Sequence, residues 1–265
     1  MLRLRHATRA SQGARNYQED ASAVWSDGGV THPQARPSGA GLDLVAVLAD
    51  GMGGHIGGAL ASRTICAAFL DALATPAGLA ADRLRAALVA ANGAVADKVA
   101  EDAGLAGMGA TLVGVAFSAG GIEWVSVGDS PLYLIRRGEI ARLNEDHSLA
   151  PMLDRMVADG RLSADQARSD PRRHYLRAAV SGEELDLIDL SQRPLRLESG
   201  DVIRVASDGI HTLDDGEVAG LVSGHLDQGP DAIAAALVRA VDRAGDDFQD
   251  NTTVVVIAVD DARSL

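Results

Sequence analysis

The sequence predicts an α+β fold in which two mainly antiparallel sheets pack face to face and pairs of helices cover their outer surfaces. Three observations support this prediction. Two consecutive helical patterns occur early, a block of strand patterns follows, and two late helical patterns precede a final apolar strand. The regular alternation of strand and helix that indicates a parallel sheet is missing. The strands should therefore pair with one another rather than through helical crossovers.

The helical segments are recognised by apolar residues three and four positions apart. Residues 58–73 and 79–102 carry this spacing over several turns. Shorter helices are expected at residues 151–159, 163–168, 215–223 and 231–244. A one-sided apolar surface is typical of helices that cover a sheet.

Strands are expected where apolar residues alternate or run together between turn residues. The expected strands are residues 2–9, 21–25, 43–50, 110–118, 122–127, 132–136, 139–143, 185–197, 201–208 and 252–259. Residues 26–41, which contain several glycines, prolines and serines, are expected to form a surface hairpin loop.

Composition limits the class of protein. With 265 residues, 47% hydrophobic and 23% charged, the chain is expected to form one soluble domain over residues 1–265. A net charge of −13 argues against binding to nucleic acid or to anionic membranes. Cys66 is alone, so neither a disulfide nor a cysteine-based zinc site is expected. Without an apolar leader or an apolar run near 18 residues, a cytoplasmic location is expected.

The segment from Leu48 to Gly58 is the most unusual part of the sequence. An apolar strand ends in Asp50, and five glycines follow within residues 51–58. Such a loop lets the backbone approach a ligand closely. The spacing does not match a dinucleotide fingerprint, and a phosphate-loop lysine is missing because Lys98 is the only lysine. A carboxylate beside a free backbone carbonyl suits a hard cation.

The same design recurs at other strand ends. Asp50, Asp129 and Asp208 each stand at the end of an expected strand, and Asp20 and Asp250 each stand just before the start of one. If these strands pair antiparallel, the end of one meets the start of the next, and the carboxylates converge on one rim. Two like charges ~4 Å apart repel by about 4 kcal/mol even at an effective dielectric near 20. The sequence therefore predicts a metal centre there.

Seven short motifs, taken in order, make the chain resemble the metal-dependent protein phosphatases of type 2C in their bacterial form. They are Arg15-x-x-x-Glu19-Asp20, DGMGGH at 50–55, GMGATL at 107–112, VGDS at 127–130, EDHSL at 145–149, SDG at 207–209 and DNTTVVV at 250–256. Each motif is weak alone, but seven in the family's order across nearly the whole chain are specific.

The resemblance implies a four-layer α-β-β-α sandwich with a centre of two Mn²⁺ or Mg²⁺ ions at one end. It implies that Asp50 bridges both cations and that the Gly51 carbonyl binds one of them. Asp208 and Asp250 would complete the other site. Two such cations ~3.5–4 Å apart lower the pKa of a bridging water from 15.7 towards about 7, which yields hydroxide for in-line attack on phosphorus.

Further residues receive roles from the same resemblance. Glu19 and Asp20 would contact the cations through water, and Asp129 would help to hold a third, weaker cation. Arg15 would bind the substrate phosphate, since its planar guanidinium donates two parallel hydrogen bonds. Residues 148–185 correspond to the family's variable flap beside the active site. We call them the flap segment, and Arg172 and Arg173 within it are candidates for docking a phosphopeptide.

Several positions depart from the family pattern or carry no expected role. Met52 stands where many eukaryotic relatives have a histidine proposed as general acid, so the proton donor to the leaving oxygen is open. Pro131 replaces a common arginine and should precede a strand, because it lacks an N–H. Gln18 replaces an asparagine. His55 and the pair Asp146-His147 are expected to be structural. The histidines without ligand-like spacing are His6, His32, His174, His211 and His225.

The function expected from these observations is hydrolysis of phosphoserine and phosphothreonine in proteins by a cytoplasmic, monomeric enzyme that opposes a Ser/Thr kinase. Two alternatives stay open at this point. The chain could be a catalytically weak module that uses the phosphatase fold to bind phosphoproteins, or it could hydrolyse a small phosphate ester by the same metal chemistry. The presence of all the expected metal-binding acids argues against the weak module.

Overall fold

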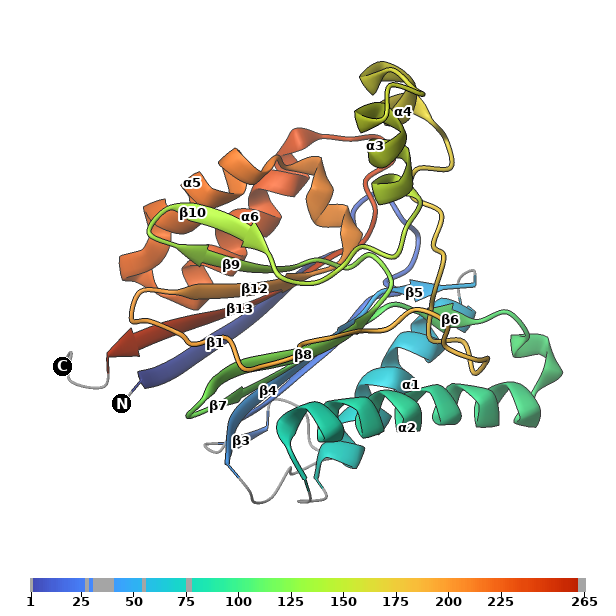
Figure 1. Cartoon of the computed structure of the whole chain (residues 1–265), viewed down its shortest axis with the longest axis horizontal. Coiled ribbons are helices and arrows are strands. Elements are labelled where there is room, and N and C mark those ends of the chain that lie inside the picture. Colours follow the sequence, from blue (N-terminus) through green and yellow to red (C-terminus); the bar gives the residue numbers. More distant parts are fainter. Residues whose placement is uncertain (1, 27–28, 31–40, 54–55, 75–77, 262–265) are drawn as a thin grey trace.

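Two antiparallel sheets form the centre of the protein (Figure 1). The computed structural model describes residues 2–26, 29–30, 41–53, 56–74 and 78–261. One sheet has five strands in the order β1-β13-β12-β9-β10, and the other has six in the order β11-β8-β7-β4-β2-β3. The two short strands β5 and β6 pair separately at one end of the sandwich.

The strands have the following bounds. They are β1 (Leu2–Ser11), β2 (Ala21–Ser26), β3 (Gly29–Val30), β4 (Leu42–Ala49), β5 (Gly51–Met52), β6 (Gly109–Ala110), β7 (Leu112–Ser118), β8 (Gly121–Val127), β9 (Leu132–Arg136), β10 (Glu139–Arg142), β11 (Asp189–Leu190), β12 (Val202–Ala206) and β13 (Thr252–Asp261). The helices are α1 (Ile56–Leu73), α2 (Ala80–Glu101), α3 (Ala150–Ala158), α4 (Ala164–Ser169), α5 (Asp215–His225) and α6 (Pro230–Ala244), with short 3₁₀ turns η1 (Ala103–Leu105), η2 (Asp208–Thr212) and η3 (Leu226–Gln228).

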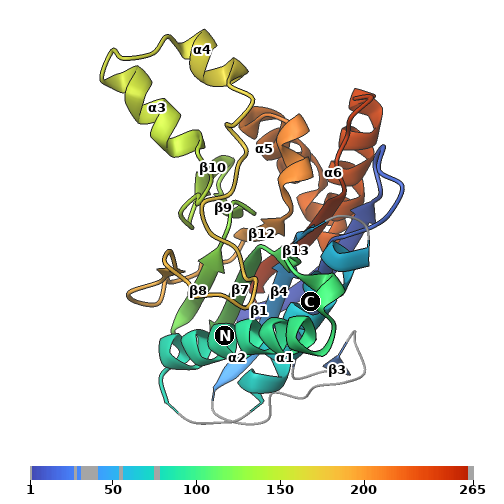
Figure 2. The same ribbon diagram turned by 90° about the vertical axis from the view of Figure 1, so that its right-hand side faces the viewer.

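Three apolar layers hold the sandwich together. Val24, Leu48 and Ile257 belong to the layer between the two sheets. A second layer lies between the six-stranded sheet and helices α1 and α2, and a third lies between the five-stranded sheet and helices α5 and α6. Full burial of one such side chain contributes roughly 1.5–3 kcal/mol. The predicted four-layer α-β-β-α architecture is confirmed (Figure 2).

The contact between α1 and the sheet depends on one glycine. Gly114 lies on β7 beneath the ring of Phe69, which is fully buried on α1. A Cβ at Gly114 would overlap that ring, so a larger residue would push the helix away from the sheet. Close packing here fixes α1, whose first turn follows the glycine-rich loop.

The strand register explains why the acids converge. In the antiparallel pair β2–β4, Ala21 lies opposite Ala49, so Asp20 and Asp50 leave the sheet side by side. In the pair β12–β13, Ala206 lies opposite Val254, which brings the Asp208 and Asp250 segments together in the same way. The expected pairing of strand ends with strand starts is therefore confirmed.

One strand prediction was wrong. Residues 185–197 form only the short strand β11 and an isolated bridge between Ile122 and Leu195. Leu190 packs on the layer beneath α1 and α2, whereas Leu195 packs on the layer between the sheets. The segment thus crosses the edge of the sandwich, and Pro194 has no N–H for a ladder. Its apolar spacing reflects two cores and not one strand.

Other expectations held, with small shifts at the ends of elements. Helix α1 begins at Ile56, two residues earlier than expected. Pro131 directly precedes β9, and its carbonyl accepts a hydrogen bond from the Ala206 N–H at 3.1 Å. Of the expected loop at 26–41, residues 27–28 and 31–40 lie outside the described residues. Within the described part of the chain, no helix combines the length and apolarity needed to cross a bilayer.

Candidate functional site

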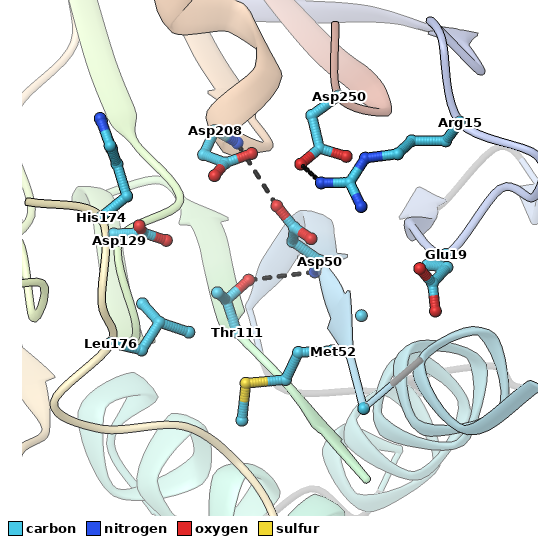
Figure 3. A pocket seen from close by; sticks show the side chains of 12 residues that line it. Arg15, Glu19, Asp50, Met52, Thr111, Asp129, His174, Leu176, Asp208 and Asp250 are labelled. Carbon is cyan, nitrogen blue, oxygen red and sulfur yellow. Dashed lines mark hydrogen bonds and ion pairs between the residues drawn. The ribbon is translucent and has the colours of Figure 1, made fainter. Parts of the chain in front are cut away.

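A cavity of about 320 Å³ opens at the end of the sandwich where β4, β8 and β12 finish and β13 begins (Figure 3). Its walls come from the ends of β4, β8 and β12, from the start of β13, from the loop between β1 and β2, and from the flap segment. The lining residues are Arg15, Glu19, Asp50, Gly51, Met52, Gly53, Thr111, Asp129, His174, Leu176, Asp208 and Asp250.

Asp50 is the central acid, and its backbone is fixed by Thr111. The Asp50 N–H donates to Thr111 Oγ1 at 3.0 Å, and the Thr111 N–H donates to the Asp50 carbonyl at 2.9 Å. Thr111 Oγ1 also shares a 2.7 Å hydrogen bond with Ser130 Oγ. Three motifs of the sequence are thus joined behind one carboxylate. The Asp50 carboxylate itself is left facing the cavity, where Oδ2 lies 3.5 Å from the Asp208 N–H.

The backbone at Gly51 passes through a space that admits no side chain. A Cβ there would collide with the backbone carbonyls of Glu19 and Gly58. Glycine at 51 therefore keeps the loop, the start of α1 and the residues before β2 in close contact. This explains why the strand that ends at Asp50 continues into glycine.

Asp208 begins the 3₁₀ turn η2 and is positioned by Ser207. The Ser207 hydroxyl donates to Asp20 Oδ2 at 2.7 Å and accepts from the Thr253 N–H at 2.8 Å. One hydroxyl therefore joins the acid before β2, the acid after β12 and the start of β13. At the next position, a Cβ on Gly209 would collide with the Asn251 carbonyl, so this crossing also requires glycine.

Arg15 and Asp250 form an ion pair at the rim of the cavity. Asn251 holds the two segments that carry them together. Its Oδ1 accepts from the Glu19 N–H at 2.8 Å, and its Nδ2 donates to the carbonyls of Gln12 and Tyr17 at 2.8 and 2.9 Å. The loop between β1 and β2 is therefore shaped by a side chain from the start of β13.

The carboxylates in this region carry more negative charge than the protein neutralises. Burial, with the neighbouring charge of Asp208, raises the pKa of Asp50 well above its usual range. Burial and the charge of Asp250 raise the pKa of Asp208. Burial raises the pKa of Asp20 to about 6 and that of Asp129 to about 7. Each raised pKa indicates that the ionised carboxylate lacks enough positive charge nearby to offset its burial.

Two buried oxygens support the same conclusion. Within the described part of the chain, Glu19 Oε1 and Asp20 Oδ1 have no hydrogen-bond partner. A buried acceptor without a partner costs roughly 1–3 kcal/mol, and more when it is charged. Both oxygens belong to the acids behind Asp50 and Asp208, where water or a cation shell would satisfy them.

The donor set fits divalent cations that prefer oxygen. Carboxylates and one backbone carbonyl are the hard ligands chosen by Mg²⁺ and Mn²⁺. As the side chains stand, no group of three or more Asp, Glu, His or Cys among the described residues is already arranged to hold an ion. Asp250 is turned towards Arg15 instead. The backbone brings these oxygen donors to one end of the sandwich.

The structure brings the predicted site residues Arg15, Glu19, Asp50, Gly51, Asp129, Asp208 and Asp250 to this one cavity, with Asp20 directly behind it. Asp146 and His147 lie outside it. The Ser148 N–H donates to Asp146 Oδ1 at 2.8 Å, and the Gly128 N–H donates to His147 Nδ1 at 3.2 Å. These contacts are the structural hydrogen bonds expected for that pair. His55 lies outside the described residues.

Thr111 and His174 are two of the lining residues that were not assigned to the site from the sequence. Thr111 lies in the recognised GMGATL motif, beside glycines at the start of a strand, so the motif could have indicated that it lies at the site. His174 was set aside because it has no partner at ligand-like spacing. It enters the cavity from the flap segment, and a local spacing rule cannot detect a contact that only the path of that segment creates.

An oxygen-rich, acid-lined cavity thus lies at the end of an α-β-β-α sandwich. A family profile described as protein phosphatase 2C matches residues 36–223. This span is well over half of the chain, and the chain belongs to the protein phosphatase 2C family.

Named relatives agree with the family assignment. The serine/threonine protein phosphatase PstP of Mycobacterium tuberculosis is 38% identical over 173 residues, which are 64% of this chain and 32% of PstP. The match thus spans about a third of the length of that relative. A crystal structure of M. tuberculosis PstP/Ppp has a TM-score of 0.76 at 29% identity and covers 97% of this chain and 99% of that one.

A second solved structure is the catalytic domain of PstP in complex with two manganese ions. It has a TM-score of 0.74 at 30% identity, and the match covers 98% of this chain and 100% of that one. The likeness therefore includes both sheets, the helix pairs and the flap segment, and not only the region matched by the family profile.

Proposed function

We propose that this protein is a metal-dependent phosphatase that hydrolyses phosphoserine and phosphothreonine in proteins. The observation that carries the proposal is the cavity in which Asp50, Asp208 and Asp250 converge with insufficient neutralising charge, in a chain of the protein phosphatase 2C family. Serine/threonine phosphatases named among its relatives support the same substrate class.

The residues proposed to hold two Mn²⁺ or Mg²⁺ ions are Asp50, the Gly51 carbonyl, Asp208 and Asp250. Asp129 is proposed for a third cation, and Glu19 and Asp20 are proposed to contact the ions through water. The two manganese ions in the PstP structure support this assignment. When bound, such cations act as Lewis acids towards phosphoryl oxygens and lower the pKa of water for attack on phosphorus.

The chain's own contribution is positioning. Arg15 lies at the rim of the cavity, where its planar guanidinium can donate two hydrogen bonds to a phosphate. Its partner in the structure is Asp250, so phosphate binding would exchange one anionic partner for another. Thr111 and Ser207 hold the backbone and the neighbouring acids in place. Orientation of this kind lowers the barrier because little reorganisation is needed during the reaction.

The partners proposed are phosphorylated proteins and a Ser/Thr kinase that the enzyme opposes. We further propose a cytoplasmic monomer in which residues 1–265 form one phosphatase domain, with no role for nucleic acid or membrane. Helices α3 and α4 of the flap segment stand apart from the sandwich (Figure 1), and His174 and Leu176, which follow α4, line the cavity. Arg172 and Arg173 are ion-paired to Asp170 and Asp154, so a docking role for them would act through the shape of the flap.

The test is phosphate release from a phosphothreonine peptide with manganese and with EDTA, using wild type and Asp50→Asn. Turnover should require manganese and fall by at least ~10³-fold in the variant, since the variant loses a ligand on which the metal chemistry depends. Asp43→Asn is a matched control, because Asp43 is an exposed acid on the same strand. It should keep wild-type activity.

The two alternatives give different results in the same experiment. A phosphoprotein-binding module would bind the phosphopeptide and manganese without turnover. An enzyme for small phosphate esters would release phosphate from sugar phosphates faster than from the peptide. Either result would contradict the proposed function.

A further inference from the structure

The proposed reaction leaves one chemical requirement without a residue. When the ester P–O bond breaks, the serine or threonine oxygen leaves as a strongly basic alkoxide unless it receives a proton. A positioned general acid contributes typically 10²- to 10⁴-fold to such a step. Met52 occupies the loop position beside Asp50, and its thioether carries no proton to donate.

His174 is the histidine that lines the cavity within the described residues. Figure 3 places it beside Asp129, on the side opposite Arg15, with Asp50 and Asp208 between them. His174 and Asp208 line the same cavity. A phosphate held by Arg15, next to cations bound by the aspartates, would therefore have His174 on its far side.

The flap segment holds the backbone of His174 on both sides. The Leu149 N–H donates to the Tyr175 carbonyl at 3.0 Å, and the Arg177 N–H donates to the His147 carbonyl at 2.8 Å. On the other side, Arg173 donates to both carboxylate oxygens of Asp154 at 2.8 and 3.0 Å. These bonds tie the residues around His174 to the start of the flap segment and to α3.

The ring of His174 is free to serve the substrate. No described residue forms a hydrogen bond or ion pair with it, and the side chain is exposed at the mouth of the cavity. His147 is the contrasting case, because its ring is buried and accepts from the Gly128 N–H. One histidine of this region supports the fold, and the other lines the cavity.

The other lining groups are poorly suited to donate the proton. The carboxylates are needed in their ionised form as ligands. The guanidinium of Arg15 does not give up a proton in water. Histidine is the side chain that exchanges a proton near neutral pH, which suits a general acid at physiological pH.

We propose that His174 is the general acid of this phosphatase and donates an imidazolium N–H proton to the leaving serine or threonine oxygen. This inference rests on the proposed function. Water forms the new P–O bond while the ester P–O bond breaks, and the bond's electron pair goes to the leaving oxygen. That oxygen takes the imidazolium proton and departs as the alcohol. The neutral imidazole then regains a proton from the solvent.

The test measures kcat/KM of wild type and His174→Gln, with saturating manganese, on substituted phenyl phosphates and a phosphothreonine peptide. With 4-nitrophenyl phosphate, whose leaving group needs little help, the variant should stay within ~3-fold of wild type. With phenyl phosphate, whose phenol has a pKa near 10, the rate should fall ~10- to 100-fold. The phosphothreonine peptide should lose about 10²-fold or more. His174→Asn should show the same steeper dependence on the leaving group.

A flap that merely docks substrates would give another pattern. Loss of docking lowers the rates of all phenyl phosphates by a similar factor, because these substrates differ little in size. Tyr175→Ala is the matched control, since Tyr175 is the exposed neighbour of His174 and does not line the cavity. Its dependence on the leaving group should equal that of wild type.

Three outcomes would overturn the inference. An equal loss in His174→Gln across the phenyl phosphates would remove the acid role, and so would an equally steep dependence in Tyr175→Ala. Absence of turnover in wild type would overturn the proposed function and this inference together, whereas wild-type turnover with an unchanged slope in His174→Gln overturns the inference alone.

Discussion

Strand β12 has an aspartate just before it and another shortly after it, and the surroundings of the two side chains differ. Asp201 precedes the strand, and its side chain is 1% exposed. Arg136 from β9 donates to both of its oxygens at 2.7 Å, and the Glu198 N–H donates to one of them at 2.7 Å. Asp208 follows the strand and faces the cavity with other acids, and its pKa is raised.

The comparison separates a structural acid from a candidate functional one. Both are aspartates at the ends of a single buried strand. At Asp201 the fold supplies a guanidinium and a backbone donor, so the charge is satisfied within the protein. At Asp208 burial and the charge of Asp250 raise the pKa, and the cationic groups nearby do not offset that rise, so a cation from outside the chain would stabilise the ionised form. Burial without a compensating partner, and not burial alone, marks the site.

The largest expected effect comes from exchanging Asp208 for asparagine. Turnover of a phosphothreonine peptide with manganese should fall by at least ~10³-fold, because a proposed metal ligand is lost. Thermal unfolding in EDTA should show a stability equal to or above that of wild type, since one of several repelling charges is removed. A variant that unfolds at lower temperature in EDTA would contradict the comparison.

Asp201→Asn should give the opposite result. Breaking a buried pair costs typically 3–5 kcal/mol, and the partial exposure of Arg136 puts the expected loss near ~3 kcal/mol. Urea denaturation measures this loss. Below the denaturation midpoint, activity per folded molecule should stay within about twofold of wild type. Loss of activity without loss of stability would contradict a structural role for Asp201.

The metal-free protein should lose stability as pH rises from about 4 to about 7. The folded-state pKa of Asp20 is raised to about 6 from 3.8, so its protonated form is favoured in the folded state. The resulting stability is present below pH 3.8 and is lost as pH rises through 6, by about 3 kcal/mol for a shift near two units. The pKa values of Asp50 and Asp208 are raised in the same direction.

Thermal melts in EDTA across this pH range, with wild type beside Asp20→Asn, isolate the contribution of Asp20. The variant should have a shallower loss of stability with pH. Saturating manganese should flatten the wild-type curve, because a ligand that binds only the folded state stabilises it by about 2.7 kcal/mol at 100 times its Kd. If stability depended on pH equally in the two proteins, a neighbouring group would have to compensate the buried charge of Asp20.

The smallest effect is expected at an exposed ion pair near Asp201. Arg137 donates to Glu198 at 2.5 Å, but its side chain is 80% exposed. Exposed pairs contribute about 0–1 kcal/mol, so Arg137→Ala should change the free energy of unfolding by less than ~0.5 kcal/mol. Arg137 has a positive φ of 54°, and alanine keeps the Cβ, so the backbone strain is unchanged. A loss above ~1.5 kcal/mol in urea would contradict this ranking.

Much of the fold could be predicted because local patterns determine it. Apolar spacing gave the helices that cover the sheets, and the acid-ended strands gave the antiparallel convergence that the register of β2–β4 and β12–β13 confirms. Residues 185–197 failed because their apolar side chains serve two different cores. Periodicity reports that a side chain is buried, but it does not report against which layer.

By itself, the sequence determined most of the segments that form strands and helices, and it showed that acids stand at the ends of several strands. Only the tertiary structure decided which acid receives a partner. Arg136 reaches Asp201 because β9 and β12 are neighbours, and His174 reaches the cavity because the flap segment returns past it. Propensity and periodicity act over a few residues, whereas neutralisation of a buried charge depends on groups that the chain brings together from far apart.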